Sequence, residues 1–350
     1  MLVKINGIKI SGVCSCLPEN IREVSSFTDK FGEKPIKRLK KSTGVEAMHY
    51  VSDGQTASDL CFEAAKKLLA ELKVKAEDID GIVFASFSPD YKGPPTSVIL
   101  QDRLGLPQSC VAFDITYACS AYCYGLYQAS LLLSAGGCKK VLVCTGDTQT
   151  KMVNPDDRAM QVIVGDAGTV TLVEKGNDTV PFYFKTVGSA YKDLIIPAGG
   201  YRNPITEETS RAVADENGNI RSQNDLYMDG MNVMNFALTE VPIAVKELLN
   251  FSGKAKKEID LFAMHQPNKL ILDHLTLDME IPFEKMPVGL QNTGNTASAS
   301  IPLLLSVLKE RGMEFIDKKN VFACGFGMGL SVSAAVLNLS DTKIIEPVLK

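Results

Sequence analysis

Short apolar runs alternate with longer helical patterns along this chain. A continuous apolar run over residues 80–86 predicts a buried strand, and the residues before it, from about Ala57 to Lys73, have the apolar spacing of a helix. Residues 139–147 and 162–173 predict two further strands, the second with a glycine break. Because helices separate strands that are apolar throughout, the pattern indicates an α/β layered fold.

The same pattern occurs twice in the sequence. Residues 119–146 and residues 295–325 each begin with small residues, continue into an apolar helix with a Leu-Leu-Leu run, break near a glycine and end in a strand that begins near a Lys-Lys pair. This similarity predicts two halves of like construction, residues 1–176 and residues 177–350. A chance likeness of two helix–strand units is the alternative.

One long segment has no apolar period. Residues 197–226 are rich in Gly, Asn, Glu and Arg. A stretch of this length inside a compact protein is usually a functional loop or a flexible one. We expect it to form a flap over one half.

Composition and charge exclude several classes of protein. The 350 residues are 45% hydrophobic and 22% charged, which fits a globular protein and excludes disorder, collagen and coiled coil. The net charge of −4 does not favour binding to duplex nucleic acid. The longest apolar run, around Leu126 to Ala135, is far shorter than the roughly 20 residues that span a bilayer, and the N-terminus lacks a signal-peptide core. We therefore expect a soluble, cytoplasmic protein with no nucleic-acid or membrane partner.

Nine cysteines and three histidines limit the chemistry. The odd number of cysteines and the absence of a Cys-x-x-Cys pair argue against a disulfide framework. Neither Cys14 with Cys16 nor Cys119 with Cys123 has a nearby histidine that would complete a zinc site. We expect no metal ion and no bound cofactor, and most of the thiols should be buried and inert.

Three residues are candidates for chemistry because of their positions. Cys119 begins an apolar helix directly after a predicted strand, where the helix dipole should lower its pKa from ~8.5 toward neutrality. His265 follows an apolar strand, at the sheet edge where α/β proteins bind ligands. Asn295 has in the second half the position that Cys119 has in the first, so the two would face one another across a pseudo-twofold axis. The structural alternatives are a core thiol, a structural histidine and a helix N-cap.

Six segments in order carry a resemblance to a known family. They are Ala112–Ser120, Asp157–Met160 with Gly165–Gly168, Met228–Gly230, His265–Asn268, Gly294–Pro302 and Gly325–Gly329. Together they resemble the β-ketoacyl-acyl carrier protein synthase III family of the thiolase superfamily, over nearly the whole chain. The resemblance implies a five-layered αβαβα fold made of two similar halves, and a homodimer.

The resemblance also implies a reaction, a decarboxylating Claisen condensation in fatty-acid or specialised acyl-chain biosynthesis. The residue matching Cys119 carries the acyl group as a thioester. Those matching His265 and Asn295 bind the carbonyl of the malonyl thioester and stabilise the enolate left by loss of CO2. A thiolate is both a good nucleophile and a good leaving group, and one such neutral donor contributes about 10²–10³ in rate.

Further site residues follow from the same resemblance. The backbone N–H groups of Cys119 and Met328 would form an oxyanion hole, although glycine is typical at position 328. Arg158, Asn268 and Gly327 would contact the substrate. Malonyl and acyl thioesters and an acyl carrier protein are the implied partners.

Two departures from the family concern the acyl donor. The chain contains no Trp, so the aromatic side chain that stacks on coenzyme A is absent, and Ser42 replaces the arginine before Thr43-Gly44. Of the family's arginines that contact the nucleotide of coenzyme A, only Arg158 is present. These changes favour an acyl carrier protein over coenzyme A as the donor. The basic segment 34–41 is then either a docking patch for that acidic protein or a solvated helix face.

Two other functions stay open. A thiolase-type, non-decarboxylating acyltransferase would need a second active cysteine and a histidine at position 295, and Cys324 is near but offset. A non-catalytic, accessory subunit of a heterodimeric synthase would lack one of the three catalytic residues, and all three are present.

Overall fold

Two long antiparallel strands, β1 (Leu2–Leu17) and β7 (Ala167–Thr186), run side by side through the molecule. The computed structural model describes all residues from 1 to 350. With 16 and 20 residues, both strands are much longer than the usual length of about 5–6. Their register shifts near Ile8, opposite residues 175–178. Each strand therefore serves two groups of neighbours, one on either side of this irregularity.

The ten-stranded mixed sheet consists of two such groups. The spatial order is β5-β4-β6-β7-β1 in one group and β12-β13-β14-β7-β1 in the other, because β6 pairs with the first part of β7 and β14 with its last part. The bounds are β4 (Gly81–Ala85), β5 (Val111–Ile115), β6 (Lys140–Asp147), β12 (Leu261–Met264), β13 (Val321–Gly327) and β14 (Ser331–Leu337). The short strands β15 (Lys343–Ile344) and β16 (Val348–Leu349) join β1.

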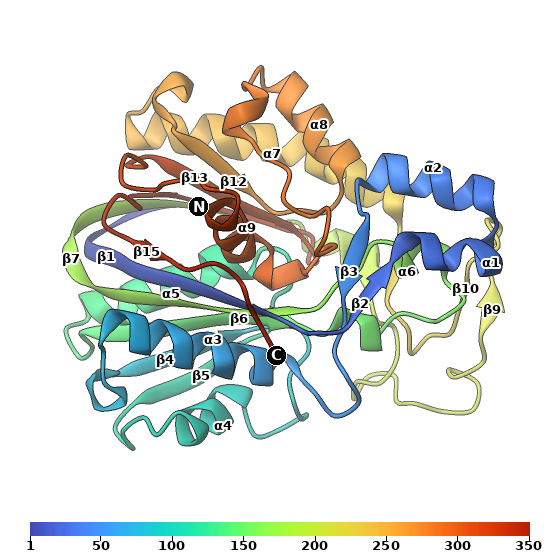
Figure 1. The fold of residues 1–350 in the computed structure, drawn as a ribbon, viewed down its shortest axis with the longest axis horizontal. Helices are drawn as coiled ribbons and strands as arrows, with labels where there is room; N and C mark the ends of the chain where they lie inside the picture. Colours follow the sequence, from blue (N-terminus) through green and yellow to red (C-terminus); the bar gives the residue numbers. More distant parts are fainter.

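Six helices form three layers around these strands (Figure 1). They are α3 (Ala57–Leu72), α4 (Thr96–Arg103), α5 (Ala121–Ser134), α7 (Gly230–Ser252), α8 (Lys269–Asp278) and α9 (Ser300–Glu310). Helices α7 and α8 cover one outer face, α3 and α4 cover the other, and α5 and α9 lie between the two groups of strands. The predicted αβαβα fold class is confirmed.

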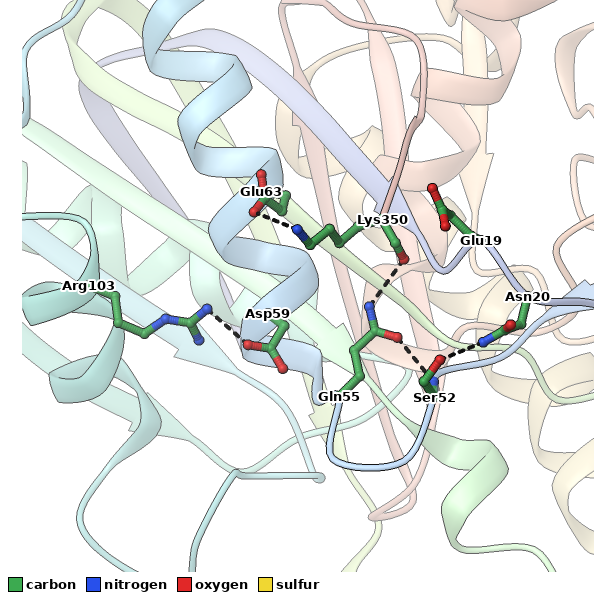
Figure 2. A pocket seen from close by; sticks show the side chains of 8 residues that line it. All are labelled: Glu19, Asn20, Ser52, Gln55, Asp59, Glu63, Arg103 and Lys350. Atoms are coloured by element: carbon green, nitrogen blue, oxygen red, sulfur yellow. Dashed lines mark hydrogen bonds and ion pairs between the residues drawn. The ribbon is translucent and has the colours of Figure 1, made fainter.

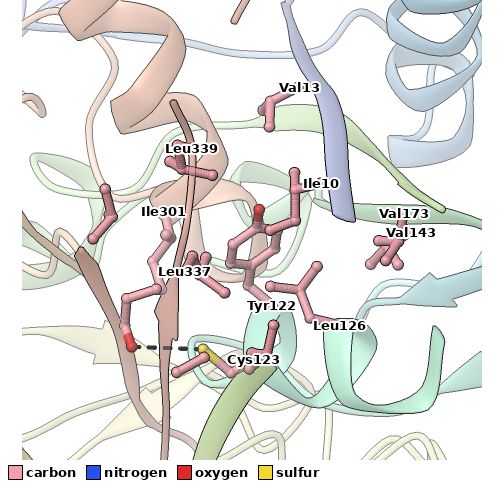
Figure 3. Close-up of a cluster of buried hydrophobic side chains, with 14 of the residues drawn as sticks. Ile10, Val13, Tyr122, Cys123, Leu126, Val143, Val173, Ile301, Leu337 and Leu339 are labelled. Carbon is pink, nitrogen blue, oxygen red and sulfur yellow. Dashed lines mark hydrogen bonds between the residues drawn. The ribbon is translucent and has the colours of Figure 1, made fainter. Parts of the chain in front are cut away.

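Alternation along the strands explains the layers. The side chain of Val83 packs against the middle helices, whereas its neighbours Ile82 and Phe84 pack against the outer helices α3 and α4. In the other group, Ala263 faces the middle layer and Phe262 faces α7. Figure 3 shows part of the middle cluster, in which side chains of α5, α9 and both groups of strands meet.

The order of elements repeats, as the sequence predicts. Helix α5 leads into β6 and then β7, and helix α9 leads into β13 and then β14. The predicted boundary between residues 176 and 177 falls inside β7, at the register shift, and stays a prediction. The strand predicted over residues 162–173 is wrong at both ends, since β7 begins at Ala167 and ends at Thr186. The residues before it instead exchange backbone hydrogen bonds with Asn295.

The flap predicted over residues 197–226 lies on the first half of the chain. It carries the short ribbon β9 (Val213–Ala214) and β10 (Ile220–Arg221), which lies at the same end of the molecule as α6 (Arg158–Gln161), α1 (Thr28–Phe31) and α2 (Glu33–Thr43) (Figure 1). Arg221 Nε contacts Asp157 Oδ2 at 2.9 Å, and the Leu226 N–H donates to the Met152 carbonyl at 2.7 Å.

The remaining short elements complete the description. They are β2 (Ile21–Glu23), β3 (Ala47–His49), β8 (Leu194–Ile195) and β11 (Tyr227–Met228). All nine cysteines are free thiols. No helix combines the length and the apolar character that crossing a membrane requires.

Gly125 allows α5 to lie close to β6. A Cβ at this position would lie 2.7 Å from Val143 Cγ1. We expect Gly125→Ala to lower the free energy of unfolding by about 1–3 kcal/mol, because the core has no room for the methyl group. Gly137→Ala is the control, since a Cβ there meets nothing within 4 Å. Denaturant titration of both variants measures the effect, and equal stabilities would contradict this account of the packing.

Candidate active site

Cys119 lies in the turn between β5 and α5, at the N-terminal end of the middle-layer helix. Its side chain belongs to a small apolar group with Ala118 and Ala297, and the half-buried Phe87 and Met328 pack against this group. Cys119 is 8% exposed, the highest value among the eight buried cysteines. The sequence therefore places the thiol correctly at a helix N-terminus.

The glycine loop, residues 325–329, closes over the turn of Cys119. A Cβ added at Gly325 would lie 2.4 Å from the carbonyl oxygen of Cys119, and one at Gly327 would lie 3.0 Å from its Sγ. Gly327 also has a φ of +148°, which side chains rarely adopt. Glycine at both positions is thus what lets the loop reach the thiol.

Serine hydroxyls hold the loop in this position. Ser331 donates to the carbonyl oxygen of Met328 at 2.9 Å, so it accepts from the Ser120 hydroxyl at 2.8 Å. Ser333 donates to the Ser120 carbonyl oxygen at 2.6 Å. These bonds join the residue after Cys119 to the start of β14, which directly follows the loop. They fix the peptide of Met328 next to the thiol.

The predicted fall in the pKa of Cys119 is wrong. Burial raises the pKa of this thiol to about 12, and the carboxylate of Asp147 acts in the same direction. The backbone N–H groups of Met328 and Cys119 oppose the rise by bonding to the sulfur. Loss of hydration therefore outweighs these backbone N–H groups, and burial favours the neutral thiol.

His265 lies directly after β12, on the other side of the glycine loop. Its backbone N–H donates to Cys324 at 2.8 Å, and its ring meets Phe326 edge-on with 5.3 Å between centroids. Phe326 stands between Gly325 and Gly327, the two loop residues that approach Cys119. Burial lowers the pKa of His265 to about 3, so the imidazole is neutral at physiological pH.

Ser300 forms a hydrogen bond with the ring of His265. Its hydroxyl, at the first residue of α9, lies 2.7 Å from His265 Nδ1 and has no other hydrogen-bond partner. With Ser300 as the donor, Nδ1 accepts and the proton lies on Nε2. The ring is then a neutral donor through Nε2–H.

Asn295 stands just before α9, and its main chain is tied to the first half. Its N–H donates to the Ile163 carbonyl at 2.8 Å, and its carbonyl accepts from Gly165 at 2.9 Å. The side-chain Oδ1 accepts from the Ala297 N–H at 3.0 Å, which leaves the NH2 group to face a ligand. Asn295 is not the N-cap of α9, because that position is Ala299. Asn295 is two residues before Ala297 in the chain, and Ala297 packs against Cys119.

Asp147 is a buried carboxylate that the sequence analysis missed. It ends β6 and accepts four hydrogen bonds, from Ser86 Oγ, Phe87 N, Ser88 Oγ and Ser298 N. It thereby joins the segment of Phe87 to the turn after Asn295. Burial raises the pKa of Asp147 to about 6. An acidic residue closing an apolar strand was the signal that could have identified it.

The predicted substrate-binding residues lie in three places. Gly327 is against the thiol, as described above. Asn268 is the N-cap of α8, where its Oδ1 accepts from the Ile271 N–H at 2.8 Å. Arg158 lines a cavity of about 900 Å³ and donates to the Asn217 carbonyl at 3.2 Å. The structure therefore brings only Gly327 into contact with Cys119.

An apolar cluster separates this cavity from the thiol. Met160 and Met228 line the cavity, and Met328 and Phe87 adjoin Cys119. All four belong to one apolar group, here called the methionine cluster. Its buried members are Val153, Met160, Ile163, Val164, Leu194, Leu226 and Leu330. The half-buried residues packed against them are Phe87, Met152, Ala190, Ile196, Met228, Val233, Phe236 and Met328. Cys119 itself does not line the cavity.

A second, polar cavity of about 380 Å³ lies beside α3 and the last residue of the chain (Figure 2). Its charges pair with one another, as in the contacts of Arg103 with Asp59 at 2.9 Å and of Lys350 with Glu63 at 3.6 Å. No predicted site residue lines it. No group of three or more His, Cys, Asp or Glu side chains in the molecule is placed to hold a metal ion.

Comparisons with known proteins identify the family. Residues 113–188 match the family described as 3-oxoacyl-[acyl-carrier-protein] synthase III, and residues 249–339 match its C-terminal part. The chain is 31% identical to the β-ketoacyl-[acyl-carrier-protein] synthase III of Caldanaerobacter subterraneus subsp. tengcongensis, over 95% of this chain and 97% of the relative. The enzyme of the same name from Rhodopirellula baltica is 30% identical, over 95% and 98%.

A solved structure agrees with these relatives. The crystal structure of a 3-oxoacyl-(acyl-carrier protein) synthase from Burkholderia xenovorans LB400 matches with a TM-score of 0.93 and 35% identity, over 100% of this chain and 99% of that one. The chain belongs to the 3-oxoacyl-acyl carrier protein synthase III family. This confirms the predicted family and the predicted enzyme class, an acyltransferase.

The protonation of His265 can be tested by nitrogen NMR of the three histidines, with His265→Gln to assign the signal. We expect His265 to stay neutral with its proton on Nε2 from about pH 8 to about pH 5.5, because its folded pKa lies well below this range. Ser300→Ala removes the donor to Nδ1 and should increase the Nδ1–H form. A His265 signal that titrates in this range would refute the assignment.

Proposed function

We propose that this chain catalyses a decarboxylating Claisen condensation. An acyl thioester on Cys119 reacts with malonyl-acyl carrier protein to give 3-oxoacyl-acyl carrier protein, in fatty-acid or specialised acyl-chain biosynthesis. The observation that carries the proposal is that a thiol and a neutral imidazole flank one glycine loop, and that an oriented carboxamide bonds to Ala297, a neighbour of the thiol. Membership of the 3-oxoacyl-acyl carrier protein synthase III family supports the same reaction.

The first step is acyl transfer to Cys119. A bond forms between Sγ and the acyl carbon, the thioester bond of the donor breaks, and the thiol proton leaves with the departing sulfur. The N–H groups of Cys119 and Met328, which bond to Sγ, are close enough to stabilise the oxyanion of this step. Because burial favours the neutral thiol, we expect the proton to leave as the new bond forms.

The second step is decarboxylation and condensation. The bond between the malonyl carbon and its carboxylate breaks, CO2 leaves, and the electron pair moves to the thioester oxygen as an enolate. His265 Nε2–H and the NH2 group of Asn295 bind this oxygen. Both donors are neutral, so they stabilise the enolate without protonating it. The enolate carbon then attacks the acyl carbonyl, and the Cys119 thiolate departs.

Helix α2 supports an acyl carrier protein as the partner and as the acyl donor. Lys34, Lys37, Arg38 and Lys41 are exposed on it and have no ion-pair partner, whereas Lys40 pairs with Glu46. Leu39 of the same helix lines the 900 Å³ cavity together with Arg158. The unpaired positive charges therefore lie on the helix whose Leu39 lines this cavity, and an acidic carrier protein would bind to them. Coenzyme A remains the alternative donor.

Strand β5 supports a homodimer. It pairs with β4 on one side only, and its residues are half-buried or exposed, with Val111 43% exposed. An open edge of this kind is a template for another strand. We infer that a second copy covers this edge.

Nine free thiols favour a reducing compartment, and we propose a cytoplasmic location. Cys324 does not support the thiolase alternative, because it is fully buried on the side of β13 that faces α7. The accessory-subunit alternative lacks support, because no catalytic position is lost.

Two variants separate the half-reactions. His265→Ala and Asn295→Ala should still accept an acyl group on Cys119, but release of CO2 from malonyl-acyl carrier protein should fall about 10²–10³-fold. Radiolabelled CO2 and the mass of the acylated protein measure the two steps. Cys119→Ala is the control, since it should lose acylation and keep the enolate donors. Full CO2 release by His265→Ala would place enolate stabilisation elsewhere.

Charge reversal on α2 tests the donor. Acyl transfer to Cys119 should be faster from acyl-carrier protein than from the matching acyl-coenzyme A. Lys37→Glu with Arg38→Glu should slow the carrier reaction about tenfold and weaken its salt dependence. The control is Lys139→Glu with Lys319→Glu, exposed lysines outside α2. Faster transfer from acyl-coenzyme A at matched concentration would reject the carrier as donor.

Sedimentation tests the dimer. At micromolar concentration we expect a species of twice the chain mass of 38.0 kDa. Replacing Val111 by Lys places a charge on the proposed edge and should shift the distribution toward the monomer. A single monomeric species for the unmodified protein would contradict the proposal.

A further inference from the structure

Met328 is the one residue of the glycine loop whose side chain packs beside the Cys119 thiol. Phe326 points the other way, against His265 and the cluster under α7. The other members of the loop are glycines. Met328 is half-buried and packs against the group formed by Ala118, Cys119 and Ala297.

The apolar neighbours of the thiol favour one direction for an acyl group. The glycine loop blocks one side, since Gly325 and Gly327 approach the backbone and the Sγ of Cys119. Ala118 and Ala297 are buried and fill another side. Among the apolar residues next to the thiol, only Phe87 and Met328 retain exposed surface, and both continue into the methionine cluster.

The side chain of Met328 fills part of the space in that direction. Cys119 lines neither the 900 Å³ cavity nor the polar cavity beside α3. The four heavy atoms of the Met328 side chain therefore occupy space that the carbons of a longer acyl chain would need. Methionine adapts its shape more readily than a branched side chain, so short chains can still be admitted.

We propose that the side chain of Met328 sets the length of the acyl group that Cys119 accepts, and that it restricts the group to short chains. This inference rests on the proposed function, because it assumes that Cys119 carries an acyl group. The backbone N–H of Met328 serves the oxyanion, and its side chain serves specificity. The two roles can be separated, because a substitution at position 328 keeps the N–H.

The test compares acyl donors on one carrier. The unmodified protein, Met328→Gly and Met328→Leu are each mixed with acetyl-, butyryl- and octanoyl-carrier protein, and the rate of acyl addition to Cys119 is followed by intact-protein mass spectrometry. In Met328→Gly the octanoyl-to-acetyl rate ratio should rise at least about tenfold, the effect of one or more methylene groups in an apolar pocket. Met328→Leu keeps the side-chain volume and should keep the ratio within about threefold.

The outcomes distinguish this inference from the proposed function. An unchanged ratio in Met328→Gly, with acetyl transfer still measurable, rejects the role of Met328 alone. Failure of the unmodified protein to accept any acyl group on Cys119 rejects the proposed function. Should Met328→Gly not fold, as judged by circular dichroism, Met328→Ala gives the same test with an intermediate rise in the ratio. An unchanged ratio there would also overturn the proposal.

Discussion

The approach of the glycine loop to the turn of Cys119 is the constraint on which the rest of the site depends. Gly325 and Gly327 leave no room for a Cβ against Cys119, and Ser331 links the Met328 carbonyl to Ser120. The loop belongs to the second half of the chain and the turn to the first, so this contact joins the two repeats. The repeat of helix and strand order is what brings the two helix ends together at the centre of the molecule.

Burial at this junction determines the charge state of each group. It raises the pKa of the Cys119 thiol and of the Asp147 carboxyl, and it lowers the pKa of His265. In each case burial shifts the equilibrium toward the neutral form, which is the effect of a dry environment on ionisable groups. A site of this kind suits chemistry in which negative charge appears only during the reaction and is met by backbone N–H groups, an imidazole N–H and a carboxamide.

Much of this arrangement could be predicted from the sequence, because it depends on local patterns and on a repeat. The periods of the helices and buried strands predicted the layers, and the matching positions of Cys119 and Asn295 in the two halves predicted that they lie close together. The resemblance to the family added His265. The start of β7 could not be predicted, since residues 163–165 pair with Asn295 far away in the sequence. The pKa of Cys119 and the role of Asp147 depend on burial by distant segments, which no local pattern records. The separation of Arg158 from the thiol by the methionine cluster is likewise a property of tertiary packing.

The central claim is that Cys119 carries the acyl group and gives it up to a decarboxylated malonyl unit. Peptide mass spectrometry of protein treated with an acyl-carrier thioester, before and after malonyl-acyl carrier protein is added, tests it most directly. The account predicts one acyl adduct, on the peptide with Cys119, that disappears with release of one CO2 for each adduct lost. An adduct on another cysteine, or one on Cys119 that persists while CO2 is released, would contradict it.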